Sequence, residues 1–305
     1  MYRNNPAAHL KRIIKAITTN QIARLAPSLY IKLTKQTGRG SEEESVEQIA
    51  SYFNRCFSEY FELIPADSNS KENYLAGKNV LEYGPGDVPA VAVLMIAHGA
   101  ERVTCVDRFP MLSLSVKNTK VLYRLINSLP DEKKKRAESC FRIPGDPSSG
   151  FDAGRIMYLV HPRGLSGLKE KADLIISRAV LEHVNDLNET FADMCRALLP
   201  DGVAVHQIDL RSHGLHMVNP LDFLTWPEML YSMMYSQKGV PNRLRIDSYR
   251  EAVKKNGLKQ ILMKPVLSAD QKDIDEVRPY LAKPFRHISD DDLMCLSFWL
   301  VLSRD

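Results

Sequence analysis

Apolar runs and amphipathic segments alternate along the chain. Short apolar runs predict buried strands at residues 79–82, 102–106, 172–177 and 203–209, with a further strand expected near 155–160. Segments of helical periodicity separate them, at residues 90–98, 113–129 and from Leu187 onward. This order of elements predicts an α/β protein with a doubly wound, parallel sheet and right-handed crossovers.

The last quarter of the chain adds one helix and two strands to this pattern. Asp247 is expected to cap a helix that runs to Lys255 and is closed by Gly257. Strands six and seven are predicted at residues 260–266 and 293–302. Two further segments carry no chemical signal: a solvated helical turn at 131–138, and a helix with a loop at 273–287.

The first part of the chain predicts a helical N-terminal extension over residues 1–75. A helix is expected at residues 45–62, with the apolar face Val46, Ile49, Phe53 and Phe57. Before it, an amphipathic arm carries Leu10, Ile13, Ile14 and Ile17 at helical spacing. No acidic residue precedes Glu42, whereas eight Lys and Arg residues do; they are Arg3, Lys11, Arg12, Lys15, Arg24, Lys32, Lys35 and Arg39.

Three roles fit this basic arm. It could dock on the rest of the chain or on a second subunit, bind an anionic lipid or polymer, or serve as a transit-type leader. Nucleic-acid binding gains little support, because the net charge of the whole chain is only +4. The arm and the rest of the chain therefore predict no nucleic-acid partner.

Length and composition are those of one soluble globular domain with additions. The 305 residues exceed a minimal doubly wound domain and fall short of two. No apolar run reaches the roughly eighteen residues needed to span a bilayer. The five cysteines are odd in number, scattered and free of Cys-x-x-Cys pairs, which argues against a disulfide framework and a zinc site. This pattern predicts that the protein is located in the reducing cytoplasm.

A nucleotide pocket is the strongest chemical signal in the chain. The strand at 79–82 leads into a turn with Gly84 and Gly86, where a Cβ would block the close approach of the backbone to a ligand. About twenty residues later the second strand ends at Asp107, where doubly wound sheets place an acid against the ribose hydroxyls of an adenosine.

The same turn argues against a dinucleotide. Pro89 stands where the dinucleotide fingerprint needs a third small residue. Glu82 adds a carboxylate that is unattractive for a pyrophosphate and suits a cationic ligand, such as the amino group and sulfonium of S-adenosylmethionine. An NAD(P)-dependent oxidoreductase and a non-catalytic relative that binds a partner remain the alternatives.

These motifs resemble the class I S-adenosylmethionine-dependent methyltransferases. Residues 81–87 read like the first motif of that family, residues 173–184 like its fourth strand and following turn, and residues 196–202 like its approach to strand five, with Asp201 in place of the usual first glycine. The resemblance implies a Rossmann-like, seven-stranded sheet in which strand seven inserts antiparallel between strands five and six. It also implies S-adenosyl-L-methionine as the cofactor.

The resemblance assigns roles to single residues around that cofactor. Glu82, Gly84 and Gly86 surround the methionine part, and Asp107 holds the ribose. Arg108 and Phe109 flank the adenine, and residues 161–164 meet its edge. Ser177, Arg178 and Ala179 line the exit of strand four.

Candidate catalytic residues follow strands four and five. His183, in the Glu182-His183 pair, is the first candidate for a general base, and its alternative role is to hold the loop. Asp209 and His213 could meet as an orienting carboxylate and a base. His206, Asp209, His213 and His216 could instead hold a divalent metal or make ordinary loop hydrogen bonds, and no metal is assigned.

Residues 211–246 form an insertion in the expected methyltransferase domain at 76–305. They carry Phe223, Trp226, Met229, Tyr231, Met233, Met234 and Tyr235, which resemble a substrate lid or pack the insertion onto the domain or a symmetry mate. As a lid, they predict a partly apolar acceptor, because Met and aromatic side chains offer area and few directional polar contacts. The N-terminal helices or this insertion could also form a homodimer.

Short runs suggest the kind of acceptor. Residues 205–213 and 242–245 are similar to bacterial enzymes of glycan and secondary-metabolite pathways. The predicted reaction is O-methylation of a sugar or secondary-metabolite hydroxyl, by in-line transfer with a histidine general base. C- or N-methylation of a small apolar acceptor is the alternative within the family.

Overall fold

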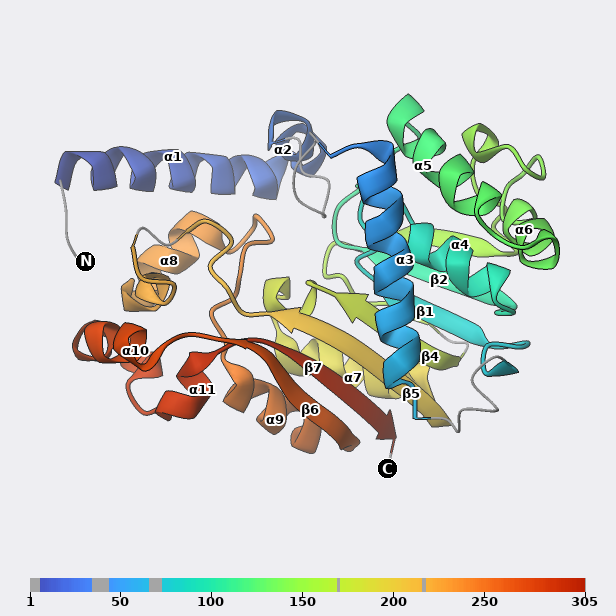
Figure 1. Cartoon of the computed structure of the whole chain (residues 1–305). Coiled ribbons are helices and arrows are strands. Elements are labelled where there is room, and N and C mark those ends of the chain that lie inside the picture. The colour runs from blue at the N-terminus through green and yellow to red at the C-terminus, as the bar shows by residue number, and fades with distance from the viewer. Residues whose placement is uncertain (1–5, 35–43, 66–72, 169–170, 216–217, 305) are drawn as a thin grey trace.

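The computed structural model describes residues 6–34, 44–65, 73–168, 171–215 and 218–304, which form one seven-stranded sheet with helices on both faces (Figure 1). The strand order is β3-β2-β1-β4-β5-β7-β6. The strands are β1 (Asn79–Tyr83), β2 (Arg102–Asp107), β3 (Ile156–Val160), β4 (Ala172–Arg178), β5 (Leu198–Asp209), β6 (Leu258–Ser268) and β7 (Cys295–Arg304). The first five are parallel, and β7 lies antiparallel between β5 and β6. The predicted doubly wound, Rossmann-like fold is therefore confirmed.

Alternate residues of the strands point to opposite faces of the sheet and belong to two separate hydrophobic cores. Val80 belongs to the core under α3 (Val46–Leu63), α4 (Ala90–Ala97) and α5 (Val116–Asn127), while its neighbour Leu81 belongs to the core under α7 (Leu187–Ala197) and α9 (Ile246–Lys255). This follows from the two-residue period of a strand. All eight residues of α4 are buried, which explains its uniformly apolar sequence. In Figure 1, α3 lies in front of the sheet and α7 behind it.

The helix predicted at 45–62 is part of this main core. Ser45 and Gln48 form a reciprocal capping box at its start, and Ile49, Phe53 and Tyr60 are buried against the sheet layer. The segment at 131–138 forms the helix α6 (Asp131–Glu138), which packs beside α4.

Several boundaries differ from the sequence prediction. Asp247 does not cap α9: the cap position belongs to Arg245, and Asp247 lies in the first turn, where an acid also interacts favourably with the helix dipole. Gly257, at φ +64°, closes the helix as predicted. Leu293 lies in α11 (Asp290–Met294), which Ser289 caps, so β7 begins later than expected. β5 begins earlier, at Leu198.

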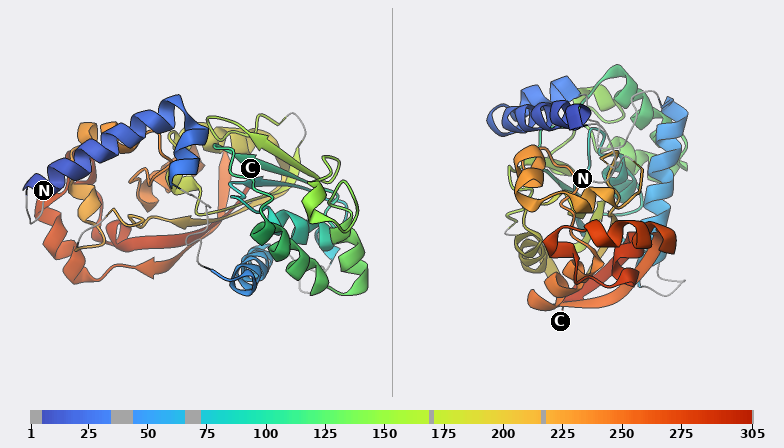
Figure 2. Two further views of the ribbon diagram at one scale, coloured as in Figure 1. Left: turned by 90° about the horizontal axis from the view of Figure 1, so that it is seen from above. Right: turned by 90° about the vertical axis from the view of Figure 1, so that its left-hand side faces the viewer.

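The amphipathic arm docks on the insertion after β5. It forms α1 (Pro6–Leu25) and α2 (Pro27–Thr34), and α1 packs along α8 (Glu228–Tyr235). The Asn20 amide donates to the carbonyl oxygen of Met233 and accepts from the backbone N–H of Gln237. Figure 2 shows α1 at the same end of the molecule as α8 and α10, away from α5 and α6. Docking on the rest of the chain is thus observed, although Leu10 and Ile14 stay exposed.

The C-terminal helices form a third, smaller core with the insertion. Phe223 and Leu224 pack there against α10 (Gln271–Val277) and the segments that follow it. Short 3-10 helices complete the described chain; they lie at Pro147–Ser149, Leu181–His183, Asp222–Thr225, Arg278–Tyr280 and Lys283–Phe285. None of the helices in the described ranges combines the length and apolar character needed to cross a membrane.

Candidate active site

A cavity of about 730 Å³ opens at the carboxyl ends of β1, β2, β4 and β5. This is where doubly wound sheets bind their ligands, at the point where the strand order reverses between β1 and β4. Most of the residues predicted from the sequence lie on its walls: Gly84, Gly86, Asp107, Arg108, Ala179, His183, Asp209 and His213. The cavity therefore brings the predicted cofactor residues and the predicted catalytic residues into one space.

The glycine turn after β1 is required by the protein itself. Gly84 and Gly86 have φ values of +68° and +74°, which glycine adopts without strain. A Cβ on Gly84 would lie only 2.3 Å from Cγ2 of Val180, in the loop after β4. Val180 therefore occupies the space that a side chain at position 84 would need. The expected reason for this glycine was the close approach of a ligand, but the protein itself already requires it.

Asp107 ends β2 with a buried carboxylate at the cavity wall. The hydroxyl of Tyr158, on β3, donates to its Oδ2 over 3.0 Å. Burial raises the pKa of Asp107 to about 7, although the bonds from Tyr158 and the Gly86 N–H oppose the rise. Tyr158 also accepts bonds from the backbone N–H groups of Met111 and Leu112, so it fixes the loop after β2. No local pattern in the sequence marks Tyr158 as a site residue, because its position beside Asp107 depends on the β2–β3 register.

Glu82 lies behind the glycine turn and is almost fully buried. Its carboxylate accepts a hydrogen bond from the thiol of Cys105, and burial raises its pKa to about 8. Burying a carboxylate in this way is unfavourable unless a positive group compensates it. An amino group or sulfonium bound in the adjacent cavity would supply that charge, so this position fits S-adenosylmethionine.

Arg108 and the loop after β4 form the next wall. The Arg108 guanidinium donates to the side chain of Asn185 and to the carbonyl oxygen of Ser236, and it lies 5.3 Å from the centre of the Phe109 ring. Ala179 has a φ of +51°, an unusual conformation for a residue with a Cβ. Arg178 is held by an ion pair of 2.5 Å with Glu59 of α3.

Besides Glu82, two more of the predicted residues, Ser177 and His206, do not line the cavity. The side chain of Ser177 is fully buried, and its hydroxyl shares a hydrogen bond of 2.7 Å with Nδ1 of His206. Nε2 of His206 lies beside the sulfur of Met194, and burial lowers the pKa of this histidine to about 3. Ser177 and His206 therefore join β4 to β5 inside the protein. His216 lies outside the described residues.

Asp209 and His213 form a paired carboxylate and imidazole at the end of β5. Arg211 binds both oxygens of Asp209 at 2.5 to 3.1 Å, and Nε2 of His213 lies 3.5 Å from Oδ2. Burial alone would raise the pKa of Asp209, but the bonds from Arg211 and His213 outweigh it and hold the pKa well below its ordinary value. Asp209 is therefore ionised at neutral pH and can orient His213.

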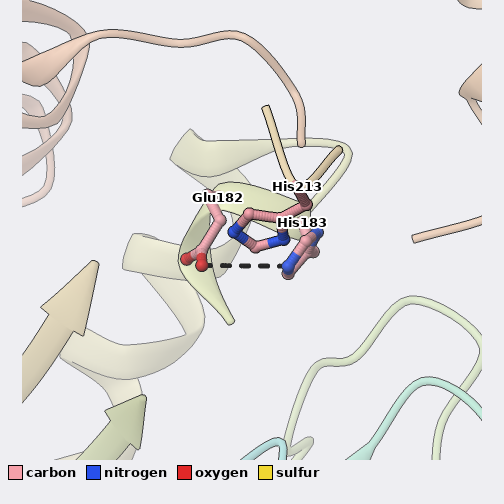
Figure 3. Close-up of side chains that lie close together, drawn as sticks. All are labelled: Glu182, His183 and His213. Atoms are coloured by element: carbon pink, nitrogen blue, oxygen red, sulfur yellow. Dashed lines mark ion pairs between the residues drawn. The ribbon is translucent and has the colours of Figure 1, made fainter. Parts of the chain in front are cut away.

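A second carboxylate and imidazole lie next to this pair (Figure 3). Nε2 of His183 lies 3.8 Å from Oε1 of Glu182, and the rings of His183 and His213 are 4.9 Å apart between centres. Burial, followed by the nearby His213, lowers the pKa of His183, so its ring is neutral at neutral pH. Donor atoms of Glu182, His183 and His213 all lie within 4.8 Å of one another, so these three residues could hold a metal ion.

The run at residues 242–245 holds this wall together. The backbone N–H of Asn242 donates to the Glu182 carbonyl oxygen, and its side chain donates to those of Leu181 and Val184. Arg245 is completely buried and donates to the carbonyl oxygens of Leu210, Leu293 and Cys295. The sequence analysis used this run only as a likeness, and the structure gives it a supporting role.

The Met and aromatic residues of the insertion do not line the cavity. Tyr231, Met234 and Tyr235 pack against α1, and Phe223 packs in the C-terminal core. Besides Arg211 and His213, the insertion contributes small and aliphatic residues to the cavity wall: Leu215, Gly239, Val240 and Pro241. The aromatic residues of the insertion therefore do not indicate an apolar acceptor.

Comparisons with known proteins agree with this site. The family described as "Methyltransferase domain" matches residues 48–262, which is most of the chain and contains the glycine turn, Asp107 and the histidine wall. No curated protein is significantly similar to the chain in sequence. The family match sets aside the oxidoreductase alternative.

Solved structures show distant likenesses. An S-adenosylmethionine-dependent methyltransferase from Mesorhizobium loti is 18% identical, with 75% of this chain and 92% of that chain covered and a TM-score of 0.40. YcgJ from Bacillus subtilis is 12% identical, with 83% and 99% covered and a TM-score of 0.42. Phosphoethanolamine N-methyltransferase 2 from Haemonchus contortus is 14% identical, with 81% and 51% covered and a TM-score of 0.43.

The sheet order, the glycine turn after β1, the acid Asp107 at the end of β2 and the family match agree on one conclusion. The chain belongs to the methyltransferase domain family and is a class I, S-adenosylmethionine-dependent methyltransferase.

Proposed function

We propose that this enzyme methylates a hydroxyl oxygen of a small molecule, a sugar or a secondary metabolite. The Asp209–His213 pair carries the proposal, because a carboxylate that orients an imidazole is an arrangement suited to removing a hydroxyl proton. His213 has a φ of +48°, and such unfavourable backbone conformations concentrate at functional sites. Its ring is about one-third exposed and faces the cavity, where an acceptor can reach it.

Each wall of the cavity has a task in this reaction. When bound, the cofactor supplies an electrophilic methyl group on a sulfonium. Asp107 would accept hydrogen bonds from its ribose, and Glu82, which a bound cation would help to ionise, would offset its positive charge. In the metal-free enzyme, His213 takes the proton of the acceptor hydroxyl while Asp209 stabilises the imidazolium that forms. Leu215, Val240 and Pro241 cover the acceptor and exclude water.

An acceptor screen tests this proposal. The purified protein is incubated with the cofactor and matched pairs of acceptors, in which one member carries a hydroxyl and the other an amine or only carbon at the same position. Mass spectrometry then locates the added methyl group. We expect methylation of the hydroxyl member alone, with loss of turnover in His213→Gln. Transfer to nitrogen or carbon at equal or higher rates would contradict O-methylation.

Other sequence predictions remain predictions. They are the cytoplasmic location, a homodimer through the N-terminal helices or the insertion, and the division of the chain at residue 75. C- or N-methylation and a non-catalytic role in partner binding are the other outcomes that the acceptor screen would reveal. Sedimentation of the purified chain at several concentrations would test the homodimer.

A further inference from the structure

Glu182 is a buried carboxylate with no hydrogen-bond partner. Its side chain is 1% exposed, and among the described residues neither carboxylate oxygen has a partner at hydrogen-bond distance; Nε2 of His183 lies 3.8 Å from Oε1, and the backbone N–H groups of Glu182 and Asp209 act on the carboxylate only from farther away. A buried carboxyl group without hydrogen-bond partners is unfavourable, because it has lost its bonds to water and has gained none in the protein. Burial accordingly raises the pKa of Glu182 well above its ordinary value. The surrounding fold therefore holds Glu182 in an unfavourable state that a bound cation would relieve.

Two imidazoles complete a set of donors around this carboxylate. His183 directs Nε2 toward Glu182, and His213 reaches the same place from the end of β5 (Figure 3). The donor atoms lie within 4.8 Å of one another, so a side-chain shift of less than about 1 Å would bring all three to the 2.0 to 2.2 Å typical of zinc bonds to nitrogen and oxygen. His183 and His213 line the cavity, whereas Glu182 is buried and is not one of its lining residues.

We propose that Glu182, His183 and His213 bind a divalent transition-metal ion, with a free coordination position that faces the acceptor cavity. Two histidines and one carboxylate with open positions are a ligand set of catalytic metal sites. The catalytic role of this ion rests on the proposed function, whereas the binding of the ion does not depend on it.

The donor set determines which ions should bind. Imidazole nitrogen suits Zn²⁺ and ions that resemble it, such as Co²⁺, whereas Mn²⁺ and Mg²⁺ prefer oxygen ligands. Asp209 is not one of the ligands, because Arg211 already occupies both of its oxygens. Affinity should follow the order Zn²⁺ above Mn²⁺, with Mg²⁺ far weaker.

An ion at this position would take over the activation of the acceptor. With the acceptor oxygen at the free position, the ion lowers the pKa of the hydroxyl, and the proton leaves to solvent. The new bond between oxygen and the methyl carbon then forms as the bond between that carbon and sulfur breaks, which leaves a neutral thioether. In the metal-loaded enzyme both histidines are ligands, and the role of His213 as a base belongs to the metal-free enzyme.

Metal binding to the full-length, tag-free protein tests the proposal. The protein is treated with a chelator, dialysed and titrated with Zn²⁺, Mn²⁺ and Mg²⁺ by calorimetry, and Co²⁺ is added separately to record its visible absorption. We expect one Zn²⁺ per chain and a Co²⁺ spectrum of a site with nitrogen and oxygen ligands. Glu182→Gln and His213→Asn should each weaken Zn²⁺ binding about 100-fold or more. Changing only an outer-shell partner of a ligand already weakens metal binding about 10- to 100-fold, so removal of a ligand should have at least as large an effect.

The controls lie in the same cavity. Glu189 lines it and pairs with Arg163 at 3.1 Å, so Glu189→Gln removes a cavity carboxylate outside the cluster and should leave Zn²⁺ binding unchanged. Because Glu182 is buried, Glu182→Gln could lower the melting temperature. The more exposed His213→Asn then serves as the second variant. No stoichiometric Zn²⁺, or equal binding by wild type and both ligand variants, would overturn the proposal.

Failure of the metal site and failure of the proposed function give different results. Calorimetry with S-adenosylhomocysteine reports the cofactor site without any acceptor or ion. If hydroxyl methylation proceeds at the same rate before and after metal loading and no ion binds, the metal proposal fails and the function stands. If one Zn²⁺ binds through the three residues but no hydroxyl is methylated, the metal site stands and the proposed function fails.

Discussion

The hydroxyl of Tyr158 donates a hydrogen bond of 3.0 Å to the carboxylate of Asp107. It ties the middle of β3 to the end of β2, so the acid that is expected to hold the ribose does not stand alone. The same hydroxyl accepts the backbone N–H groups of Met111 and Leu112. One phenol thus positions both the acid and the loop that follows it.

Cofactor affinity should depend on the ionisation of Asp107. Burial raises the pKa of Asp107 to about 7, and only the ionised carboxylate can accept bonds from both ribose hydroxyls. The contribution of Asp107 to affinity is therefore largest above this pKa and weakens as the pH falls through it, by up to about tenfold per pH unit for one proton. Glu82, whose pKa is about 8, titrates in the same range, so the part of the loss that disappears in Asp107→Ala is the part that belongs to Asp107. Calorimetry with S-adenosylhomocysteine from about pH 6 to pH 8.5 measures the effect, and Asp107→Ala should bind weakly at every pH.

Tyr158→Phe should move this transition upward. The hydrogen bond from Tyr158 lowers the pKa of Asp107, so its removal leaves the carboxyl harder to ionise. We expect the variant to lose cofactor affinity at a higher pH than the wild type, with similar affinity at the alkaline end. An unchanged midpoint would show that Tyr158 has no electrostatic influence on Asp107.

Gly84→Ala should destabilise the protein and impair cofactor binding. The alanine would have to keep the left-handed backbone conformation of Gly84, and its Cβ would collide with Val180. Together these two effects should cost about 2 to 5 kcal/mol of folding stability. Gly77 has nearly the same φ, +69°, with nothing within 4 Å of a Cβ, so Gly77→Ala should cost only about 1 kcal/mol. Thermal unfolding compares them. The double variant Gly84→Ala/Val180→Ala should recover part of the loss, and equal costs in both glycine variants would rule out the collision.

His213→Ala should lower kcat of the chelator-treated enzyme about 100-fold or more, because a general base contributes about 10² to 10⁴ in rate. Affinity for S-adenosylhomocysteine should stay the same, since the cofactor residues are elsewhere. Asp209→Asn should lower kcat as well, because the imidazolium loses its ionised partner. The exposed His287, far along the chain from the site residues, provides the control His287→Ala, and a normal kcat in His213→Ala would remove His213 as the base.

Arg245→Ala should be strongly destabilising, by about 3 to 5 kcal/mol. The guanidinium is completely buried and serves three carbonyl oxygens, which would be left without partners. Arg250 forms a more exposed ion pair with Asp292, and such pairs contribute about 0 to 1 kcal/mol. Denaturant unfolding of Arg245→Ala and Arg250→Ala gives the comparison. Similar losses in both would mean that the buried bonds contribute no more than a surface pair.

Local patterns in the sequence predicted much of this fold. Strands β1, β2 and β4 follow from apolar runs, and Gly257 follows from the need for a left-handed residue at a helix end. Within the fold, the predictions that were wrong concern the boundaries of elements. An acid such as Asp247 is compatible with the cap position and with the first turn of a helix, and an apolar residue such as Leu293 with the end of a helix and with a strand. Packing determines which of the two positions each residue occupies.

The sequence by itself determined the sheet, the glycine turn and the acid after β2, because backbone conformation and strand periodicity depend on near neighbours in the chain. Only the tertiary structure decided that Ser177 binds His206 inside the protein, that the aromatic residues of the insertion pack against α1 and the C-terminal helices, and that Glu182, His183 and His213 converge. These arrangements join residues that are up to about two hundred positions apart. Their geometry depends on strand register and on which buried polar groups find partners, and neither quantity is encoded in a local pattern.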